Sequence, residues 1–403
     1  MGKDNIFLGQ PVFGQIMSLI PRSLVAEIAS QKLSDRYYKK FKTYDHVLTM
    51  LYAAMSGADN LRAVELGLMG ASTRLAQVGM SRIPARSTIS DGNKLRSSEV
   101  FGDIYQALNL HYRPLLSDSR LAKDIFSRLT IIDSTTISLF KDILKAAGRS
   151  PASGKRKGGI KAQVSMDSAT GLPKVVCFSS GASADTPYMK KAKLSKGEIA
   201  VIDMGYCDYG VFRAWGIEGI HFVTRQKENA LFTVVKDFEL SELCDSCIGS
   251  DQLIEVVDPE SKERFMLRRI VRKAEGDSLE LVFWTNILTL TPDKIAAIYK
   301  HRWQIELLFR CLKQNFPLKY FLGDNRNAIE IQIWCCMIAH MLYKVILHQN
   351  KAKWAFSNFC DLIRQHLFTY IDLAAFVKNP VKALRNEIKA KARSPNTGQY
   401  KMF

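Results

Sequence analysis

The sequence predicts an α/β protein in which a mixed-sheet core with a strand-rich insertion follows a helical domain and precedes further helices. Apolar residues recur every three to four positions through the N-terminal part, the spacing of amphipathic helices. The chain then changes to runs rich in β-branched residues, which favour strands, and after Pro292 the helical spacing returns. We therefore expect a helical domain over residues 1–124, a core over 125–325 with its insertion at about 226–286, and a basic helical extension over 326–403.

Composition and charge bound the class of protein. A chain of 403 residues is long enough for two or three domains, and 47% hydrophobic with 24% charged residues excludes wholesale disorder. The 57 Lys and Arg residues against 39 Asp and Glu give a formal net charge of +18. Such an excess favours a polyanionic partner, nucleic acid before membrane.

No membrane segment is expected. The N-terminal residues lack the apolar run of a signal peptide, and the most apolar stretch, 329–347, is interrupted by charged residues, which predicts a buried helix. Eight cysteines in a chain of this length indicate reduced thiols in a cytoplasmic protein. Cys244 and Cys247 form a lone C-x-x-C pair, for which structural filler is favoured over a zinc site, although metal binding stays open.

One part of the helical N-terminal domain has the pattern of two helices joined by a turn. Residues 74–96 contain a short helix, breaks at Gly79 and Pro84, and then Ser87 or Thr88 as the N-cap of a second helix. The pattern fits a DNA-reading helix-turn-helix and an ordinary helical hairpin equally well.

Two of the core strands are predicted to end in an aspartate. LTIIDSTTISL holds Asp133 and EIAVIDMGYCD holds Asp203, each after a near-continuous apolar run typical of a strand buried on both faces. Active sites of such sheets lie beyond the strand ends. A hairpin between them carries Asp167 in its turn at 167–171, where an aspartate is expected for local reasons, so Asp167 stays outside the site.

A second pattern lies in YKHRWQIELLFRCLK, which is predicted to continue a helix that opens at Pro292. At about 100° per residue, Tyr299, Arg302, Glu306 and Lys313 fall on one narrow stripe opposite an apolar side. A stripe of this kind is most often a solvated face with charge pairs. Here it also supplies the third carboxylate that two strand-end aspartates require.

Three carboxylates gathered at one sheet edge need a divalent cation, or raised pKa values, to remain together. Mg²⁺ prefers oxygen ligands and completes its coordination with phosphate and water. We expect two Mg²⁺ ions, with Mn²⁺ as a substitute, clamping the attacking and leaving oxygens of an in-line phosphodiester displacement.

The spacing of the four residues on the stripe resembles the Tyr-Arg-Glu-Lys signature of DDE-type bacterial insertion-sequence transposases. The patterns DSTTI and VIDMGY around the two strand aspartates resemble the same family, and the resemblance covers approximately residues 125–325. It implies an RNase H-like core with Asp133, Asp203 and Glu306 as catalytic metal ligands. The other three signature residues would contact phosphates near the transposon end.

Four further residues are candidates for DNA contacts, and each also has an interpretation that involves no DNA. Trp303, at the edge of the stripe, is placed either to stack on an unpaired base or to anchor a core. Lys155, Arg156 and Lys157 either follow the DNA backbone or form a solvated loop. Some relatives use an insertion-domain tryptophan in forming a DNA hairpin; Trp284 lies near but is not clearly equivalent, so a hairpin intermediate stays open.

Together these observations predict a cut-and-paste DNA transposase of the bacterial cytoplasm, located at the nucleoid. It would bind the terminal inverted repeats of its element as a homodimer, hydrolyse a phosphodiester at each end, and join the freed 3′-OH to target DNA. Two rivals are an RNase H-like structure-specific nuclease and a non-catalytic DNA-binding regulator derived from a transposase. Joined products, cleavage alone, or bound but uncut DNA would distinguish the three.

Overall fold

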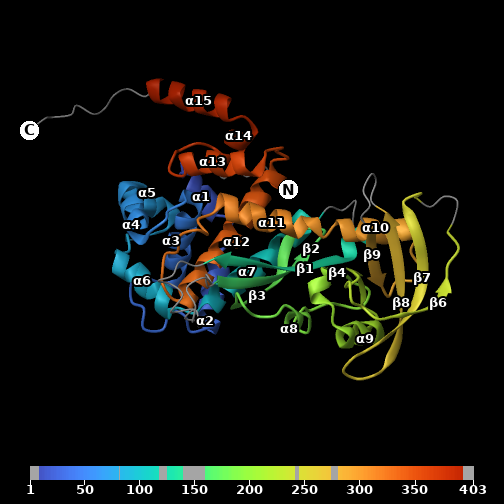
Figure 1. The fold of residues 1–403 in the computed structure, drawn as a ribbon. Coiled ribbons are helices and arrows are strands. Elements are labelled where there is room, and N and C mark those ends of the chain that lie inside the picture. Colours follow the sequence, from blue (N-terminus) through green and yellow to red (C-terminus); the bar gives the residue numbers. More distant parts are fainter. Residues whose placement is uncertain are drawn as a thin grey trace, which may run out of the picture. The chain divides into compact units, whose positions relative to one another are not determined.

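The computed structural model describes residues 9–80, 82–117, 125–138, 159–240, 245–273 and 280–393. The chain divides into two compact units. One combines Met1–Leu116 with Cys311–Phe403, and the other is Ser117–Arg310, which carries the sheet (Figure 1).

A single nine-stranded sheet organises the second unit, with the strands in the order β3-β2-β1-β4-β5-β9-β8-β7-β6. β4 is parallel to both β1 and β5, whereas β2 is antiparallel to β1 and β3 to β2. The order 3-2-1-4-5 with these directions is that of an RNase H-like core, so the predicted fold class is confirmed. The strands are β1 Leu129–Ser138, β2 Gly159–Asp167, β3 Leu172–Ser180, β4 Ile199–Ile202, β5 His221–Arg225, β6 Thr233–Asp237, β7 Ile248–Val257, β8 Arg264–Lys273 and β9 Glu280–Thr285.

The strand-rich insertion extends this same sheet. β9 pairs antiparallel with β5 on one side and with β8 on the other, so β6–β9 continue the core without a break (Figure 1). One buried apolar cluster runs through both regions, joining Ile132 and Ile202 of the core strands to Ile254 and Leu267 of the insertion. Core and insertion therefore share their hydrophobic contacts as well as their hydrogen bonds.

Helices complete the second unit. Phe212 of α9 stacks on Phe222 of β5 with ring centroids 4.1 Å apart, which seats the helix against the sheet. A short helix, α8, begins at Thr186 and has Pro187 in its first turn. The helices are α8 Thr186–Met189, α9 Tyr209–Glu218, α10 Pro292–Lys300 and the first part of α11 Trp303–Asn315.

The first unit is helical in all its described parts, as predicted for both ends of the chain. α12 is its central helix: Trp334 of α12 packs on Tyr105 of α7 with ring centroids 5.5 Å apart, and a Cβ at Gly102 would come within 3.0 Å of that indole. The helices are α1 Val12–Met17, α2 Arg22–Gln31, α3 Thr43–Ser56, α4 Leu61–Gly70, α5 Ser72–Val78, α6 Arg86–Leu95, α7 Ser98–Leu116, α12 Arg326–Gln349, α13 Phe356–His366, α14 Leu373–Lys378 and α15 Pro380–Arg393.

α12 contains the apolar stretch singled out in the sequence. By length and composition it is the one helix among the described residues that could cross a membrane, but 89% of its apolar window is buried inside the protein. The seven cysteines within the described residues are all free thiols, as expected, and Cys244 lies outside the described residues.

The two-helix pattern at residues 74–96 is present, with one correction. α5 ends at Gly79, whose φ of +90° lies in the left-handed region that glycine adopts without strain. α6 begins at Arg86, earlier than an N-cap at Ser87 or Thr88 would place it. The Arg86 N–H donates to the Glu65 carboxylate (3.1 Å), which replaces the side-chain cap that the sequence suggested.

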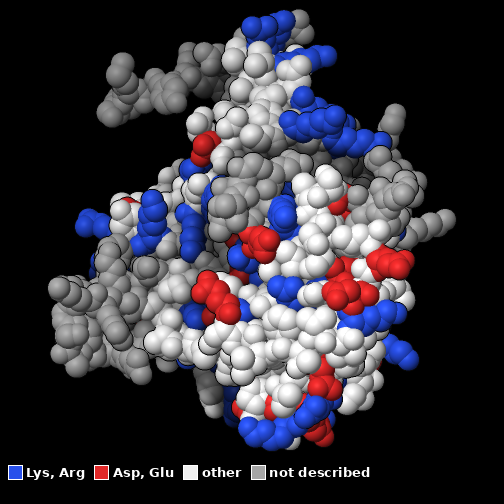
Figure 2. All heavy atoms as spheres, turned by 45° about the vertical axis from the view of Figure 1, so that its right-hand side comes forward, with Lys and Arg blue, Asp and Glu red and all other residues white. Residues whose placement is uncertain are grey.

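Charge is unevenly distributed over the surface. Figure 2 shows acidic and basic side chains intermixed over the strand-rich insertion, where Arg264 pairs with Glu255, and mostly basic side chains at the top of the view, over α15. The positive excess of the chain therefore does not come from the exposed face of the insertion.

Candidate active site

Asp133 and Asp203 occupy neighbouring positions on the two central parallel strands. The register of β1 with β4 runs from Leu129 opposite Ile199 to Ile132 opposite Ile202, and the two aspartates are the next residue on each strand. Asp203 ends its strand, as predicted. Asp133 does not, because β1 continues its pairing with β2 to Ser138 after β4 has stopped.

The signature segment forms two helices, which corrects the single continuous helix predicted from the sequence. α10 opens with Pro292, as expected, but ends at Lys300, and α11 begins at Trp303. The N–H of Arg302 donates to the Tyr299 carbonyl three residues back (2.9 Å), a tighter turn than the four-residue spacing of an α-helix. The His301 ring stacks on Phe126 with centroids 4.5 Å apart and fixes this turn.

Arg302, in that turn, bridges two of the three predicted ligands. Its guanidinium donates to Asp133 Oδ2 at 3.3 Å and to Glu306 Oε1 at 2.5 Å. The three side chains are only partly exposed, at 19% for Arg302, 18% for Asp133 and 30% for Glu306. The break between α10 and α11 thus aims one arginine at carboxylates from a strand and from a helix.

Tyr299 holds the remaining aspartate. Its hydroxyl donates to Asp203 Oδ1 at 3.3 Å, and its ring packs against Phe283 of β9 with centroids 5.1 Å apart. Burial raises the pKa of Tyr299 to about 12, so the hydroxyl remains a donor at neutral pH. Three hydrogen bonds therefore connect five residues predicted for the site: Tyr299 with Asp203, and Arg302 with both Asp133 and Glu306.

The electrostatics of the site favour a bound cation. Burial raises the pKa of Asp133 to about 6, with further upward contributions from the nearby carboxylates Asp203 and Glu306, while the Ser134 N–H and Arg302 oppose the shift. A buried carboxyl whose pKa is raised in this way gains most from a positive charge placed beside it.

The donor set fits a divalent metal in its chemistry, since all three side chains offer carboxylate oxygens. Within the described residues, however, no group of three or more His, Cys, Asp and Glu side chains is drawn together closely enough to hold a metal ion. The Arg302 guanidinium donates to both Asp133 and Glu306 and so bridges two of the three carboxylates.

The other predicted DNA contacts differ in their outcome. Trp303 is 50% exposed, with the Arg310 guanidinium 5.8 Å from its ring centroid, so it is not a core anchor. Lys313 lies on the exposed side of α11, about two turns after Glu306. Lys155, Arg156 and Lys157 lie outside the described residues.

The aspartates left out of the site have local structural roles. Asp167 accepts the Ala169 N–H at 2.9 Å in the turn of the β2–β3 hairpin, and Gly171 completes that turn with a φ of +61°. Asp208 caps α9 through the Val211 N–H. Trp284 is buried in β9 and donates to Gln226, so its indole is part of the core.

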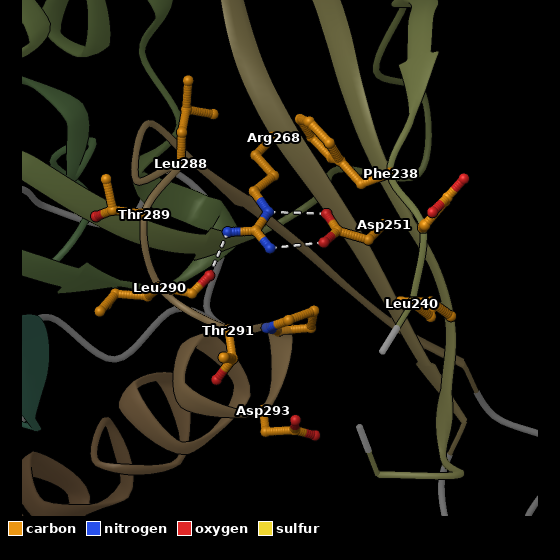
Figure 3. A pocket seen from close by; sticks show the side chains of 11 residues that line it. Phe238, Leu240, Asp251, Arg268, Leu288, Thr289, Leu290, Thr291 and Asp293 are labelled. Carbon is orange, nitrogen blue, oxygen red and sulfur yellow. Dashed lines mark hydrogen bonds and ion pairs between the residues drawn. The ribbon is translucent and has the colours of Figure 1, made fainter. Parts of the chain in front are cut away.

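One group near the site was not predicted. Arg268 of β8 and Asp251 of β7 form a buried two-pronged ion pair at 2.8 and 2.6 Å, shown in Figure 3. Arg268 also donates to the carbonyls of Leu290 (2.5 Å) and Ile287 (3.3 Å), in the segment leading into α10. The insertion strands therefore fix the start of the helix that carries Tyr299.

The same ion pair lines a cavity of about 410 Å³ at the N-terminus of α10, between the insertion strands and residues 288–293 (Figure 3). The sequence contained a signal for this ion pair. Arg268 and Asp251 are charged residues within β-branched, apolar runs, where a buried charge is rare without a partner.

Comparisons with known proteins add to this geometry. Residues 124–342 match the family described as the transposase DDE domain, and residues 8–81 match a domain of unknown function. A protein of Sinorhizobium fredii named "Putative transposase y4zB" is 30% identical over 301 residues, covering 74% of this chain and 81% of its own. One of Synechocystis named "Putative transposase for insertion sequence element IS4SA" is 26% identical, covering 66% and 73%.

Among solved structures, the piggyBac transposase in its synaptic complex with hairpin DNA matches with a TM-score of 0.40 and 11% identity, over 98% of this chain and 86% of that one.

Proposed function

Because this chain belongs to the family of transposase DDE domains, and is thus a DDE transposase that cleaves DNA, we propose that it moves its element by cut-and-paste transposition. The enzyme would hydrolyse one phosphodiester at each end of the element and join the freed 3′-OH to target DNA. The observation that carries this proposal is the arrangement of Asp133 and Asp203 side by side, with Glu306 tied to Asp133 through Arg302.

Membership of the family implies dependence on a divalent metal, which we propose to be Mg²⁺, in two sites held by Asp133, Asp203 and Glu306. When bound, the metal supplies Lewis-acid stabilisation of the attacking and leaving oxygens at phosphorus. Mn²⁺ should substitute for Mg²⁺.

The chain's own residues would orient the DNA. Tyr299, Arg302 and Lys313 contact phosphates near the transposon end, the arginine through two parallel hydrogen bonds and the lysine as a point charge. To reach a phosphate, the Arg302 guanidinium has to leave Asp133 and Glu306, and this movement frees both carboxylates at the moment when DNA arrives. Trp303, half exposed at the start of α11, would stack on an unpaired base.

The remaining parts have proposed roles in the same reaction. Residues 1–124 would recognise the terminal inverted repeats, 125–325 would carry the chemistry, and 326–403 would add basic contacts to DNA. The protein would act as a homodimer in the DNA complex and reside in the bacterial cytoplasm at the nucleoid. The rival nuclease and regulator functions are not favoured by family membership.

The test is a plasmid assay with the element's own terminal repeats in the presence of Mg²⁺. Wild type should give excised and joined products, whereas Asp203→Asn and Glu306→Gln should bind the ends and leave them uncut. Asp167→Asn is the matched control: it removes a carboxylate from the neighbouring strand, but asparagine keeps the turn, so cleavage should persist. Cleavage by the Glu306→Gln enzyme would refute the assigned site.

A further inference from the structure

The connection between α2 and α3, residues 33–42, contains two non-glycine residues in the left-handed region of backbone conformation. Leu33 has a φ of +50° and Tyr37 a φ of +70°. For a bulky aromatic residue this conformation is a genuine outlier, which persists only where the surrounding structure enforces it. We call residues 33–42 the basic-aromatic loop.

Arg96 enforces the conformation from the inside. Its side chain is fully buried at the end of α6, and it donates to Ser34 Oγ at 3.1 Å and to the Phe41 carbonyl at 2.9 Å. Its guanidinium also lies 4.3 Å from the centre of the Tyr38 ring. Both ends of the loop and its middle are therefore tied to one buried cation.

The inner side of the loop has a second tie. The Asp35 carboxylate accepts both the backbone N–H of Thr43 (2.6 Å) and its hydroxyl (2.8 Å), at the start of α3. The only acid of the loop is thus turned inward and committed to capping a helix.

The outer side presents the opposite chemistry. Tyr37 is 88% exposed, and the Arg36 guanidinium lies 5.0 Å from its ring centroid. Lys39, Lys40 and Lys42 are also exposed, and residues 36–42 contain no acid. Within the described part of the chain, neither Lys39 nor Lys40 forms a salt bridge.

We propose that the outer side of this loop is a DNA-binding site, in which Lys39 and Lys40 contact backbone phosphates and Tyr37 packs its ring on a sugar or an unpaired base. This inference rests on the proposed function, which makes DNA the partner. It gives a role to part of residues 8–81, which match a domain of unknown function.

DNA fits the loop because it offers phosphate charge and planar rings together. Lysines flanking an exposed aromatic ring are the combination that binds a nucleic-acid backbone and its bases. The Tyr37 ring is 88% exposed, so the strained backbone presents it to solvent and not to the core. Because Arg96 has already ordered the loop, little conformational freedom remains to be lost on binding.

The first test neutralises the lysines in the full-length protein. A labelled duplex carrying the element's terminal repeat is titrated by fluorescence anisotropy at several salt concentrations. Lys39→Gln/Lys40→Gln should weaken binding about tenfold, and the slope of log affinity against log salt should fall by about 1–2. Lys190→Gln/Lys193→Gln removes the same charge from an exposed turn after α8 and should leave the slope near that of wild type.

The second test distinguishes a role of the Tyr37 ring in DNA binding from a role in stability. Asparagine tolerates the left-handed region, so Tyr37→Asn should keep or raise the melting temperature while binding weakens about tenfold. Tyr37→Phe keeps the ring and should bind almost as wild type does.

The proposal is overturned if Tyr37→Asn binds as wild type does, or if both lysine pairs change the salt slope equally, since net charge alone would then explain the effect. Binding lost only together with a lower melting temperature would likewise assign the loop a purely structural role. Failure of wild type to cut its ends would instead refute the proposed function, whereas intact cleavage with unaffected loop variants would refute the loop alone.

Discussion

Arg302 donates to Asp133 and Glu306 at once, so in the DNA-free protein it engages carboxylate oxygens that the proposed divalent cation would need. Two carboxylates beside one guanidinium keep a net negative charge, so the arginine offsets only part of their mutual repulsion. If the proposed metal site is correct, metal binding and arginine pairing compete for the same oxygens.

This competition gives a prediction for Arg302→Ala. The variant should bind Mn²⁺ about tenfold more tightly than wild type in the absence of DNA, a difference of about 1.4 kcal/mol. It should nevertheless cleave transposon ends more slowly, because it lacks the proposed contact of Arg302 with a phosphate. Mn²⁺ affinity is measured by electron paramagnetic resonance. Arg310→Ala is the control: Arg310 is exposed on the same helix with its guanidinium 5.8 Å from the Trp303 ring centroid, and its loss should leave Mn²⁺ affinity unchanged. Weaker Mn²⁺ binding by Arg302→Ala would show that the arginine assists the metal.

The pKa of Asp133 gives a second prediction at this scale. Burial raises this pKa to about 6 in the folded chain, above the ordinary value near 4 of an unfolded one. The contribution of the carboxyl to stability is therefore full below about pH 4 and is lost as the pH rises through about 6.

Asp133→Asn should accordingly raise the free energy of unfolding at pH 7 by up to about 3 kcal/mol and flatten its pH dependence between about 4 and 6. The measurement is urea unfolding in the presence of a chelator across that range. A variant that is less stable than wild type at pH 7 would contradict the assignment of a destabilising charge to this position.

The residues proposed for the site were chosen from patterns in the sequence, but their contacts in the structure could not be predicted. Asp133, Asp203 and Glu306 follow from apolar runs and helical spacing, which are local patterns. The contact of Arg302 with Asp133 joins positions 169 residues apart, and nothing in a local pattern specifies it. The ties of Arg96 to the α2–α3 connection are likewise products of tertiary packing.

At the scale of elements, the break between α10 and α11 determines which carboxylates Tyr299 and Arg302 contact. Helical spacing predicted one stripe of four side chains, because the apolar positions fit a single helix. In the structure His301 and Arg302 form a turn between two helices. Tyr299 therefore donates to Asp203, while Arg302 donates to Asp133. The helical spacing of the sequence continues through residues 301 and 302, but tertiary contacts end one helix before them and start another after them.

The start of α10 depends on the insertion through Arg268, which leads to a prediction about two variants. Arg268→Met leaves Asp251 buried and unpaired, so it should destabilise the protein by about 3–5 kcal/mol. Arg268→Met with Asp251→Leu removes both charges and should recover most of that loss, as measured by urea unfolding.

The double variant still lacks the hydrogen bonds to the Leu290 and Ile287 carbonyls that hold the segment before α10. Its single-turnover cleavage rate should therefore stay below that of wild type at full end occupancy, with end binding unchanged. Recovery of the cleavage rate along with stability would mean that Arg268 serves the fold alone.

At the scale of the molecule, alternation and apolar runs predicted a mixed sheet followed by more strands, and this was confirmed. They did not predict that β9 would join β5 to β8, because strand order is set by which edges meet in space. The leucine at position 267 therefore contributes to a cluster that also holds Ile132 and Ile202 of the central strands.

Because one sheet and one apolar cluster include both regions, core and insertion should unfold as a single cooperative unit. Leu267→Ala, a change in the insertion, should lower the opening free energy of amides in β4 and β5 as much as in β8, by about 2–5 kcal/mol. Native-state hydrogen exchange over a urea series measures both sets of amides. Leu231→Ala, at an 87% exposed position preceding β6, should change neither. If β8 opened while β4 and β5 kept their wild-type protection, the insertion would be an independent folding unit.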